Sequence, residues 1–125
     1  MNTINFEDIT DFITTAPNKA LATKGPHGLN VIPVSTLKIH QEAQIMLVNY
    51  FMNKTIDNLK QDEDCSLVCW NGGEGYQIKG LVDYKTSGKT FDQISHETKM
   101  TFPNRTVQGI LLFSPKEIFT VSIPL

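Results

Sequence analysis

Three short turn signals divide much of this sequence into pairs of extended apolar segments. The first, Gly25-Pro26-His27-Gly28, separates residues 19–24 from 29–39, and Asn71-Gly72-Gly73-Glu74-Gly75 separates 65–70 from 76–84. The third, Ser114-Pro115-Lys116, separates 107–113 from 117–123. Tight connections of this kind join antiparallel strands, because parallel neighbours need a crossover of about a dozen residues. The sequence therefore predicts an antiparallel sheet built mainly from hairpins.

One further strand and three helices complete the predicted fold. Residues 45–50 form an apolar strand, which gives about seven strands in all. Helices are expected from Asn5 to Pro17, from Asn53 through Leu59, and over residues 90–100, because apolar residues recur three or four apart in each. We predict a mainly β fold of one domain, residues 1–125, in which an antiparallel Greek-key type barrel or strongly bent sheet carries peripheral helices.

The composition bounds the class of protein. The 125 residues are 40% hydrophobic and 19% charged, ordinary values for one globular domain. A net charge of -2 offers no basic excess to displace counterions, so no nucleic-acid partner is expected. No apolar run approaches the roughly 18 residues of a membrane span, and the first residues lack the basic and apolar regions of a signal peptide. We therefore expect no membrane partner and a cytoplasmic location.

Cys65 and Cys69 both lie in the strand expected over residues 65–70. Four strand residues span roughly 13 Å at about 3.3 Å per residue, which exceeds the roughly 7 Å that a disulfide permits between Cα atoms. The same spacing puts both thiols on one face of the strand, so buried free thiols are expected. No other cysteine or nearby histidine completes a zinc site, and no metal is predicted.

Asn53-Lys54-Thr55 stands where the apolar strand ends and a short helix begins. Asn53 is the expected N-cap, and the first N–H groups of the helix point back toward the turn. A lysine is electrostatically misplaced there, because the positive end of the helix dipole favours anions. An ammonium, a hydroxyl and free amides in one small volume suit a phosphate monoester. The alternative, a solvated lysine and a threonine that competes for the cap, stays open on these local features.

Pro33 interrupts the longest extended segment, residues 29–39. Because proline cannot donate to a neighbouring strand, it demands a sheet edge, a bulge or a break. A broken ladder would leave backbone groups of residues 32–35 free for a ligand. An ordinary edge strand explains the same proline equally well.

The usual catalytic constellations are missing from the sequence. The three histidines fall on turns or on the flank of a helix, so no Ser-His-Asp or Cys-His arrangement can be recognised. No carboxylate pair is spaced for acid–base work. Any chemistry would therefore come from a bound cofactor.

Four segments together resemble the pyridoxamine 5'-phosphate oxidase-like FMN-binding split-barrel family, and above all its short FMN-binding members. They occur in the same order as in that family and span nearly the whole chain: Ala20-Leu21-Ala22-Thr23, Ile32-Pro33-Val34-Ser35, Met52-Asn53-Lys54-Thr55 with Asn58-Leu59, and Gly75-Tyr76-Gln77-Ile78-Lys79-Gly80. Each segment is a weak signal alone, and four in register are fairly specific. The resemblance implies a homodimer that binds two FMN molecules in its interface.

The resemblance also assigns roles to particular residues. Lys54 and Thr55 would hold the phosphate, with Asn58 as a further candidate one turn later. The backbone of Ile32, Pro33, Val34 and Ser35 would lie along the flavin ring, and Phe51 and Met52 would flank the ribityl chain. Gln77 of the partner subunit would contact the flavin, and Leu125 would cover its ring.

Departures from the family pattern limit the expected activity. True pyridoxamine phosphate oxidases place several basic residues on the flavin phosphate and on the substrate phosphate. Here Lys54 stands almost alone, Arg105 is the only arginine, no C-terminal Trp-Arg segment follows, and the aromatic residue that short members carry near the Pro33 position is missing. We expect an FMN-dependent oxidoreductase with another substrate. The alternatives are a non-enzymatic flavin carrier or electron-transfer protein, and a structural dimer that has lost its cofactor.

Overall fold

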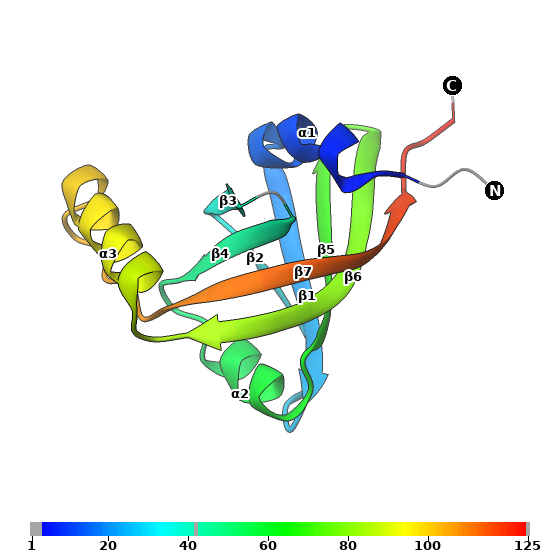
Figure 1. The fold of residues 1–125 in the computed structure, drawn as a ribbon. Coiled ribbons are helices and arrows are strands. Elements are labelled where there is room, and N and C mark those ends of the chain that lie inside the picture. Colours follow the sequence, from blue (N-terminus) through cyan, green and yellow to red (C-terminus); the bar gives the residue numbers. More distant parts are fainter. Residues whose placement is uncertain (1–3, 42, 125) are drawn as a thin grey trace.

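A computed structural model describes residues 4–41 and 43–124 of the chain (Figure 1). The helical elements in this part are a short 3-10 helix η1 (Phe6–Asp8), α1 (Thr10–Thr15), α2 (Asn53–Gln61) and α3 (Lys89–Thr101). The strands are β1 (Asn18–Gly25), β2 (Gly28–Pro33), β3 (Leu37–His40), β4 (Gln44–Asn49), β5 (Asp64–Asn71), β6 (Glu74–Lys85) and β7 (Gly109–Thr120). The predicted mainly β class, with seven strands and three α-helices, is confirmed among these residues.

All seven strands belong to one sheet, in the order β2-β1-β5-β6-β7-β4-β3. Every neighbouring pair is antiparallel. Strands β2 and β3 follow one another in sequence but lie at opposite ends of this order, so the sheet must bend strongly to bring them together. Figure 1 shows the result, a curved sheet with α1 and α2 at opposite ends and α3 to one side.

The main core fills the inside of this bend. Fully buried side chains from both halves of the sheet meet there, among them Leu21 of β1, Leu67 of β5, Ile78 of β6 and Phe113 of β7. Ile9 and Ile13 close one end of the core from the N-terminal helical segment. Burial alternates along β6: Ile78, Gly80 and Val82 are buried and the residues between them are exposed.

A second, smaller core lies between α3 and the other face of β4 and β7. It consists of buried Met46, Val48, Ile94, Val107 and Ile110. Strand β4 is therefore buried on both faces, which explains why residues 45–48 form a continuous apolar run instead of alternating. On α3, Ile94 and Thr98 are buried and His96 is exposed.

Residues 29–39 divide at Pro33, which is one of the alternatives that the proline predicted: β2 ends at Pro33 and β3 begins at Leu37. The strand prediction around residues 114–116 is wrong. Ser114-Pro115-Lys116 is not a turn, because β7 runs unbroken through it. Lys79 pairs with Glu117 and Gly80 pairs with Pro115, so Lys116 is an extra residue in a β-bulge. A bulge tolerates the proline because the local ladder is already interrupted.

The cap predicted for α2 is also wrong, because its N-cap residue is Met52 and Asn53 is the first residue of the helix. Asn5 is the N-cap residue of η1, although it makes no side-chain cap hydrogen bond within the described residues. The buried free thiols predicted for Cys65 and Cys69 are confirmed.

None of the helices in the described residues has both the length and the apolar character needed to cross a membrane. In the same part of the chain, no three histidine, cysteine or acidic side chains cluster closely enough to hold a metal ion.

Candidate functional site

The first turn of α2 is left without a side-chain cap. Its N-cap residue, Met52, carries no acceptor and makes no cap hydrogen bond, and the turn contains no acidic residue. The first intrahelical bond is donated by the Ile56 N–H to the Met52 carbonyl. Within the described residues, the N–H groups of Asn53, Lys54 and Thr55 therefore have no acceptor. Three unpaired donors and the Lys54 ammonium share the positive end of the helix, an arrangement that attracts anions.

The three candidate phosphate residues differ sharply in exposure. The Lys54 side chain is exposed, whereas Thr55 and Asn58 retain only 1% and 0% of their accessible surface. The Thr55 hydroxyl accepts a hydrogen bond of 2.9 Å from the Asn30 side chain. Burial on one face of α2 explains the contrast, because Thr55, Ile56, Asn58 and Leu59 all point toward the sheet.

Asn58 uses its whole amide group within the protein. Its Oδ1 accepts the His27 N–H at 3.0 Å, and its Nδ2 donates to the Gly28 carbonyl at 3.1 Å and to the Thr23 hydroxyl at 3.2 Å. Asn58 therefore connects α2 to the turn between β1 and β2. The single described chain leaves it no surface from which to contact a ligand.

The segment predicted to lie along the flavin ring spans the end of β2 and the start of the linker to β3. Ile32 and Pro33 pair with Leu21 and Ala20 of β1, so the opposite edge of this terminal strand has no strand partner in the described residues. The Val34 N–H is not free, because it donates to the Lys19 carbonyl at 3.0 Å. Pro33 and Ser35 are exposed, Ile32 is half-buried and Val34 is buried. A pocket of about 380 Å³ borders residues 31–34 and is also lined by residues 17–20 and Trp70.

The candidate ribityl segment lies beside the candidate ring segment. The Thr36 hydroxyl, one residue after Ser35, shares a hydrogen bond of 3.0 Å with the Tyr50 hydroxyl at the end of β4. Phe51 follows with 81% of its surface exposed, whereas Met52 is 7% exposed. Residues 32–36 and 50–55, far apart in sequence, are thereby brought to one side of the molecule.

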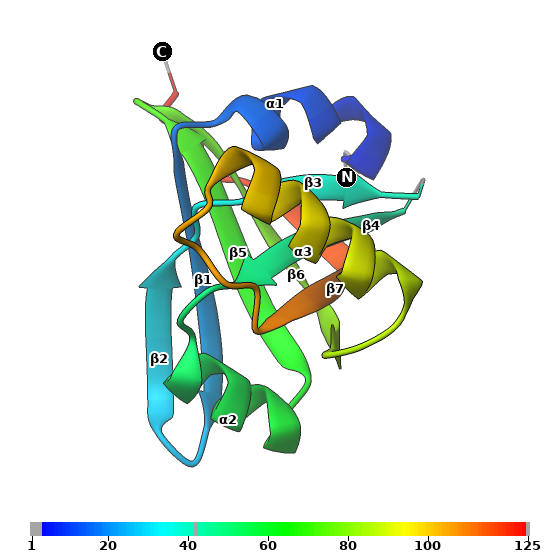
Figure 2. The ribbon, with the colours of Figure 1, turned by 90° about the vertical axis from the view of Figure 1, so that its left-hand side faces the viewer.

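A smaller cavity of about 130 Å³ opens between α3 and this pair of segments, lined by Thr36, Tyr50 and Phe102 among others. The guanidinium of Arg105 lies 4.0 Å from the Phe102 ring centre and 5.2 Å from that of Tyr50. Figure 2 shows the chain between α3 and β7 running past the end of β4. Arg105 therefore holds this connection against the site through cation–π contacts.

Asn49 is a buried polar residue that the sequence did not single out. It precedes Tyr50 on β4, retains 2% of its surface, and donates from Nδ2 to the Tyr84 hydroxyl at 2.8 Å. Its Oδ1 is buried and has no partner among the described residues. A buried acceptor without a donor is costly. Asn49 has the same parity on β4 as Ile45 and Leu47, so this atom faces the main core and is not on a surface that a ligand could reach. An asparagine inside an apolar strand was the available signal.

Gln77 lies on the outer face of the sheet. Its neighbours across β5 and β7 are Val68 and Phe119, which share that face because cross-strand partners point the same way. The structure thus separates Gln77 from the α2 site of its own chain, consistent with a role only toward a second copy. Leu125 lies outside the described residues.

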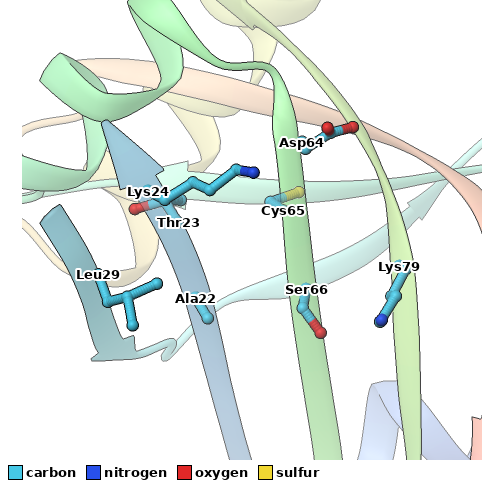
Figure 3. Close-up of a pocket in the computed structure, with 8 residues that line it drawn as sticks. All are labelled: Ala22, Thr23, Lys24, Leu29, Asp64, Cys65, Ser66 and Lys79. Atoms are coloured by element: carbon cyan, nitrogen blue, oxygen red, sulfur yellow. The ribbon is translucent and has the colours of Figure 1, made fainter. Parts of the chain in front are cut away.

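The same outer face contains a hollow of about 350 Å³. Figure 3 shows the side chains that line it from β2, β1, β5 and β6: Ala22, Thr23, Lys24, Leu29, Asp64, Cys65, Ser66 and Lys79. Leu29 is 90% exposed here, and Val31, opposite Ala22 on the same face, is 67% exposed. Leu29 and Val31 therefore leave apolar surface exposed on this face.

Solved structures share this fold, although no family model and no curated protein matches the sequence. The HupZ protein of Group A Streptococcus superposes with a TM-score of 0.81 at 13% identity, over 95% of this chain and 95% of that one. An FMN-binding protein from Syntrophomonas wolfei gives 0.77 at 17% identity, over 95% and 90% of the two chains. A proposed pyridoxamine 5'-phosphate oxidase from Lactobacillus delbrueckii gives 0.75 at 15% identity, over 95% of each chain.

These likenesses define the fold and nothing finer. The chain has the pyridoxamine 5'-phosphate oxidase-like split-barrel fold, as the four sequence segments predicted.

Proposed function

We propose that this protein binds FMN, with the phosphate at the start of α2 and the flavin ring along Ile32–Ser35. The observation that carries the proposal is the uncapped first turn of α2, where three N–H donors without acceptors in the described residues lie beside exposed Lys54. A doubly ionised phosphate supplies the missing acceptors and offsets the lysine charge. Phe51 and Met52, in the connection between β4 and α2, flank the ribityl chain in this arrangement.

The fold fits the proposal as well, because one of its solved neighbours is an FMN-binding protein.

We propose further that the protein is a homodimer formed through the outer face of β2, β1, β5, β6 and β7. Leu29, Val31, Leu81 and Phe119 expose apolar surface there, and a second copy of the chain would cover it. The partner subunit's Gln77 then reaches the flavin, and the partner's Leu125 covers the ring. The free thiols of Cys65 and Cys69 fit a reducing compartment such as the cytoplasm.

The proposed activity is that of an FMN-dependent oxidoreductase or flavin reductase acting on a small acceptor other than pyridoxamine phosphate. Bound FMN would supply the hydride or electron transfer. The residues of this chain would bind the phosphate through α2, orient the ring along β2, and exclude water through the dimer interface.

A non-enzymatic flavin carrier or electron-transfer protein is the second candidate. It is favoured by the lack of histidines and carboxylates in segments 32–36 and 50–55, which would otherwise provide proton transfer beside the flavin. A carrier needs no such group.

Two measurements test these proposals. The purified protein is titrated with FMN, FAD and pyridoxal phosphate and followed by visible absorbance; we expect saturable FMN binding with a perturbed flavin spectrum, and an unperturbed spectrum would contradict the proposed cofactor. The FMN-loaded protein is then mixed anaerobically with NADH or NADPH. Rapid bleaching supports the oxidoreductase, and a flavin that stays oxidised supports the carrier.

A further inference from the structure

The turn between β1 and β2 is fastened to α2 by an unusually dense set of polar contacts. Asn58 binds Thr23, His27 and Gly28 through its amide group, and Asn30 donates to the Thr55 hydroxyl. At the outer end, His27 Nε2 lies 3.0 Å from the Asp57 carboxylate. Figure 2 shows the hairpin of β1 and β2 descending alongside α2. We refer to these contacts of residues 23–30 with α2 as the hairpin clamp.

The backbone of the hairpin approaches α2 as closely as a glycine allows. A Cβ atom placed on Gly25 would lie 2.8 Å from the Cα atom of Asn58 and 2.9 Å from its Oδ1. Real Cβ contacts are not that short, so any side chain at Gly25 would push the hairpin away from the helix. This observation is independent of the hydrogen bonds and points to the same close docking.

The clamp joins the two halves of the proposed flavin site. Strand β2 carries Ile32 and Pro33 at its far end, and α2 presents the uncapped donors and Lys54. Since β2 is a terminal strand, only its pairing with β1 and its contacts with α2 and the linker hold it in the described residues. The spacing between the ring segment and the phosphate segment therefore depends on the clamp.

We propose that Thr55 and Asn58 are positioning residues of this clamp and that Lys54 with the free N–H groups alone holds the phosphate. This inference rests on the proposed function, since it assigns roles within that site. The burial of Thr55 and Asn58, at 1% and 0% exposure, and their engagement with the hairpin carry it. Loss of the clamp weakens the binding of both the ring and the phosphate of the flavin, because it misplaces the ring segment and the phosphate segment relative to each other.

Comparison of FMN with riboflavin separates the two kinds of role. Riboflavin shares the ring and the ribityl chain but lacks the phosphate. Thr55→Val, which keeps the shape and removes the acceptor for Asn30, is expected to weaken the binding of both flavins by a common factor of about 5-fold, the worth of one hydrogen bond. Gly25→Ala, which pushes the hairpin away from α2, is likewise expected to weaken the binding of both flavins by a common factor. Lys54→Ala is expected to weaken the binding of FMN and to leave the binding of riboflavin unchanged.

Three controls show whether a change in affinity comes from the clamp. Thr55→Ser retains the hydroxyl and should restore binding of both flavins. Gly73→Ala adds a methyl group in another hairpin, where the nearest atom of Ile123 lies at an ordinary 3.5 Å, and should bind both as wild type. Circular dichroism at the titration temperature establishes that each variant is folded, so a change in affinity reflects the site and not unfolding.

The outcomes are distinct. A folded Thr55→Val protein that loses affinity for FMN alone overturns the positioning role and makes Thr55 a phosphate contact. Folded Thr55→Val and Gly25→Ala proteins that bind both flavins like wild type overturn the clamp. A wild-type protein that binds neither flavin overturns the proposed function, and with it the role of the clamp in flavin binding.

Discussion

At the scale of single residues, the helical period decides which polar side chains of α2 can meet a ligand. Thr55, Ile56, Asn58 and Leu59 lie on the buried face, whereas Lys54 and Asp57 lie outside it. The sequence identified Lys54 and Thr55 together because they are adjacent. Adjacent helix residues differ by about 100° in direction, so one is exposed and the other is buried.

The first prediction concerns Lys54. Replacement by alanine removes a charge-assisted hydrogen bond to the phosphate, and we expect FMN binding to weaken by about 1–3 kcal/mol. Lys60→Ala is the matched control, because Lys60 is an exposed lysine in the last turn of the same helix. Fluorescence titration with FMN measures both. Equal affinities for wild type and Lys54→Ala would remove Lys54 from the site.

The second prediction concerns the thiols. Burial, with a smaller contribution from the Asp64 carboxylate, raises the pKa of Cys65 from 9.0 to about 12. Burial raises the pKa of Cys69 from 9.0 to about 11, although the Lys19 charge opposes the shift. Because the thiolate is the reactive form, we expect both cysteines to resist a disulfide reagent at about pH 8 and to react in concentrated guanidinium chloride. Stoichiometric labelling of the native protein within seconds would contradict this.

The same pKa shifts set a pH dependence of stability. Above pH 9.0 the unfolded chain releases thiol protons that the folded chain retains, so the unfolded state becomes more stable relative to the folded state. The contribution of the thiols to the free energy of unfolding is therefore complete below pH 9.0 and declines as the pH rises toward 11–12. The denaturant concentration at the unfolding midpoint, measured from neutral to alkaline pH, tests the direction. An increase of this concentration as the pH rises above 9.0 would contradict the prediction.

At the scale of elements, local turn chemistry misled the sequence prediction once and guided it twice. Gly25–Gly28 and Asn71–Gly75 are hairpin connections, as their composition indicates. Ser114-Pro115-Lys116 has a similar composition but lies inside β7. The deciding contact is remote in sequence: Gly80 on β6 receives the bulge, and a Cβ there would overlap the Ser114 carbonyl oxygen. No local signal could reveal this pairing.

The third prediction follows from that contact. Gly80→Ala should lower the free energy of unfolding by about 1–3 kcal/mol, the usual cost of overpacking. This exceeds the roughly 0.4–1 kcal/mol that alanine gains by restricting the unfolded chain. Gly73→Ala, whose added methyl group would meet Ile123 only at ordinary contact distances from 3.5 Å, should change stability by less than about 0.5 kcal/mol. Denaturant unfolding measures both variants, and equal stabilities would show that β7 does not press on Gly80.

At the scale of the whole molecule, the predicted number of strands is right for reasons that cancel. Division of residues 29–39 adds a strand, and fusion of residues 107–123 into β7 removes one. The sheet order depends on long-range pairs, such as β1 with β5 and β4 with β7, which no local pattern encodes. The four family-like segments supplied what periodicity could not. They led to the fold, whereas Asn49, Asn30 and the hairpin clamp became visible only from the packed structure.

The last prediction concerns the outer face of the sheet. Leu29 is 90% exposed in the single chain, and in the proposed dimer the partner covers it. Leu29→Glu would bury a carboxylate in that interface, so we expect the dissociation constant of the dimer to rise at least about 10-fold. FMN binding should weaken as well, because the contact from the partner's Gln77 is lost. Met100→Glu is the control, since Met100 is 74% exposed on α3, away from this face. Analytical ultracentrifugation with and without FMN measures assembly. A Leu29→Glu protein that stays dimeric with wild-type FMN affinity would exclude this face as the interface, because a buried unpaired charge could not be tolerated there.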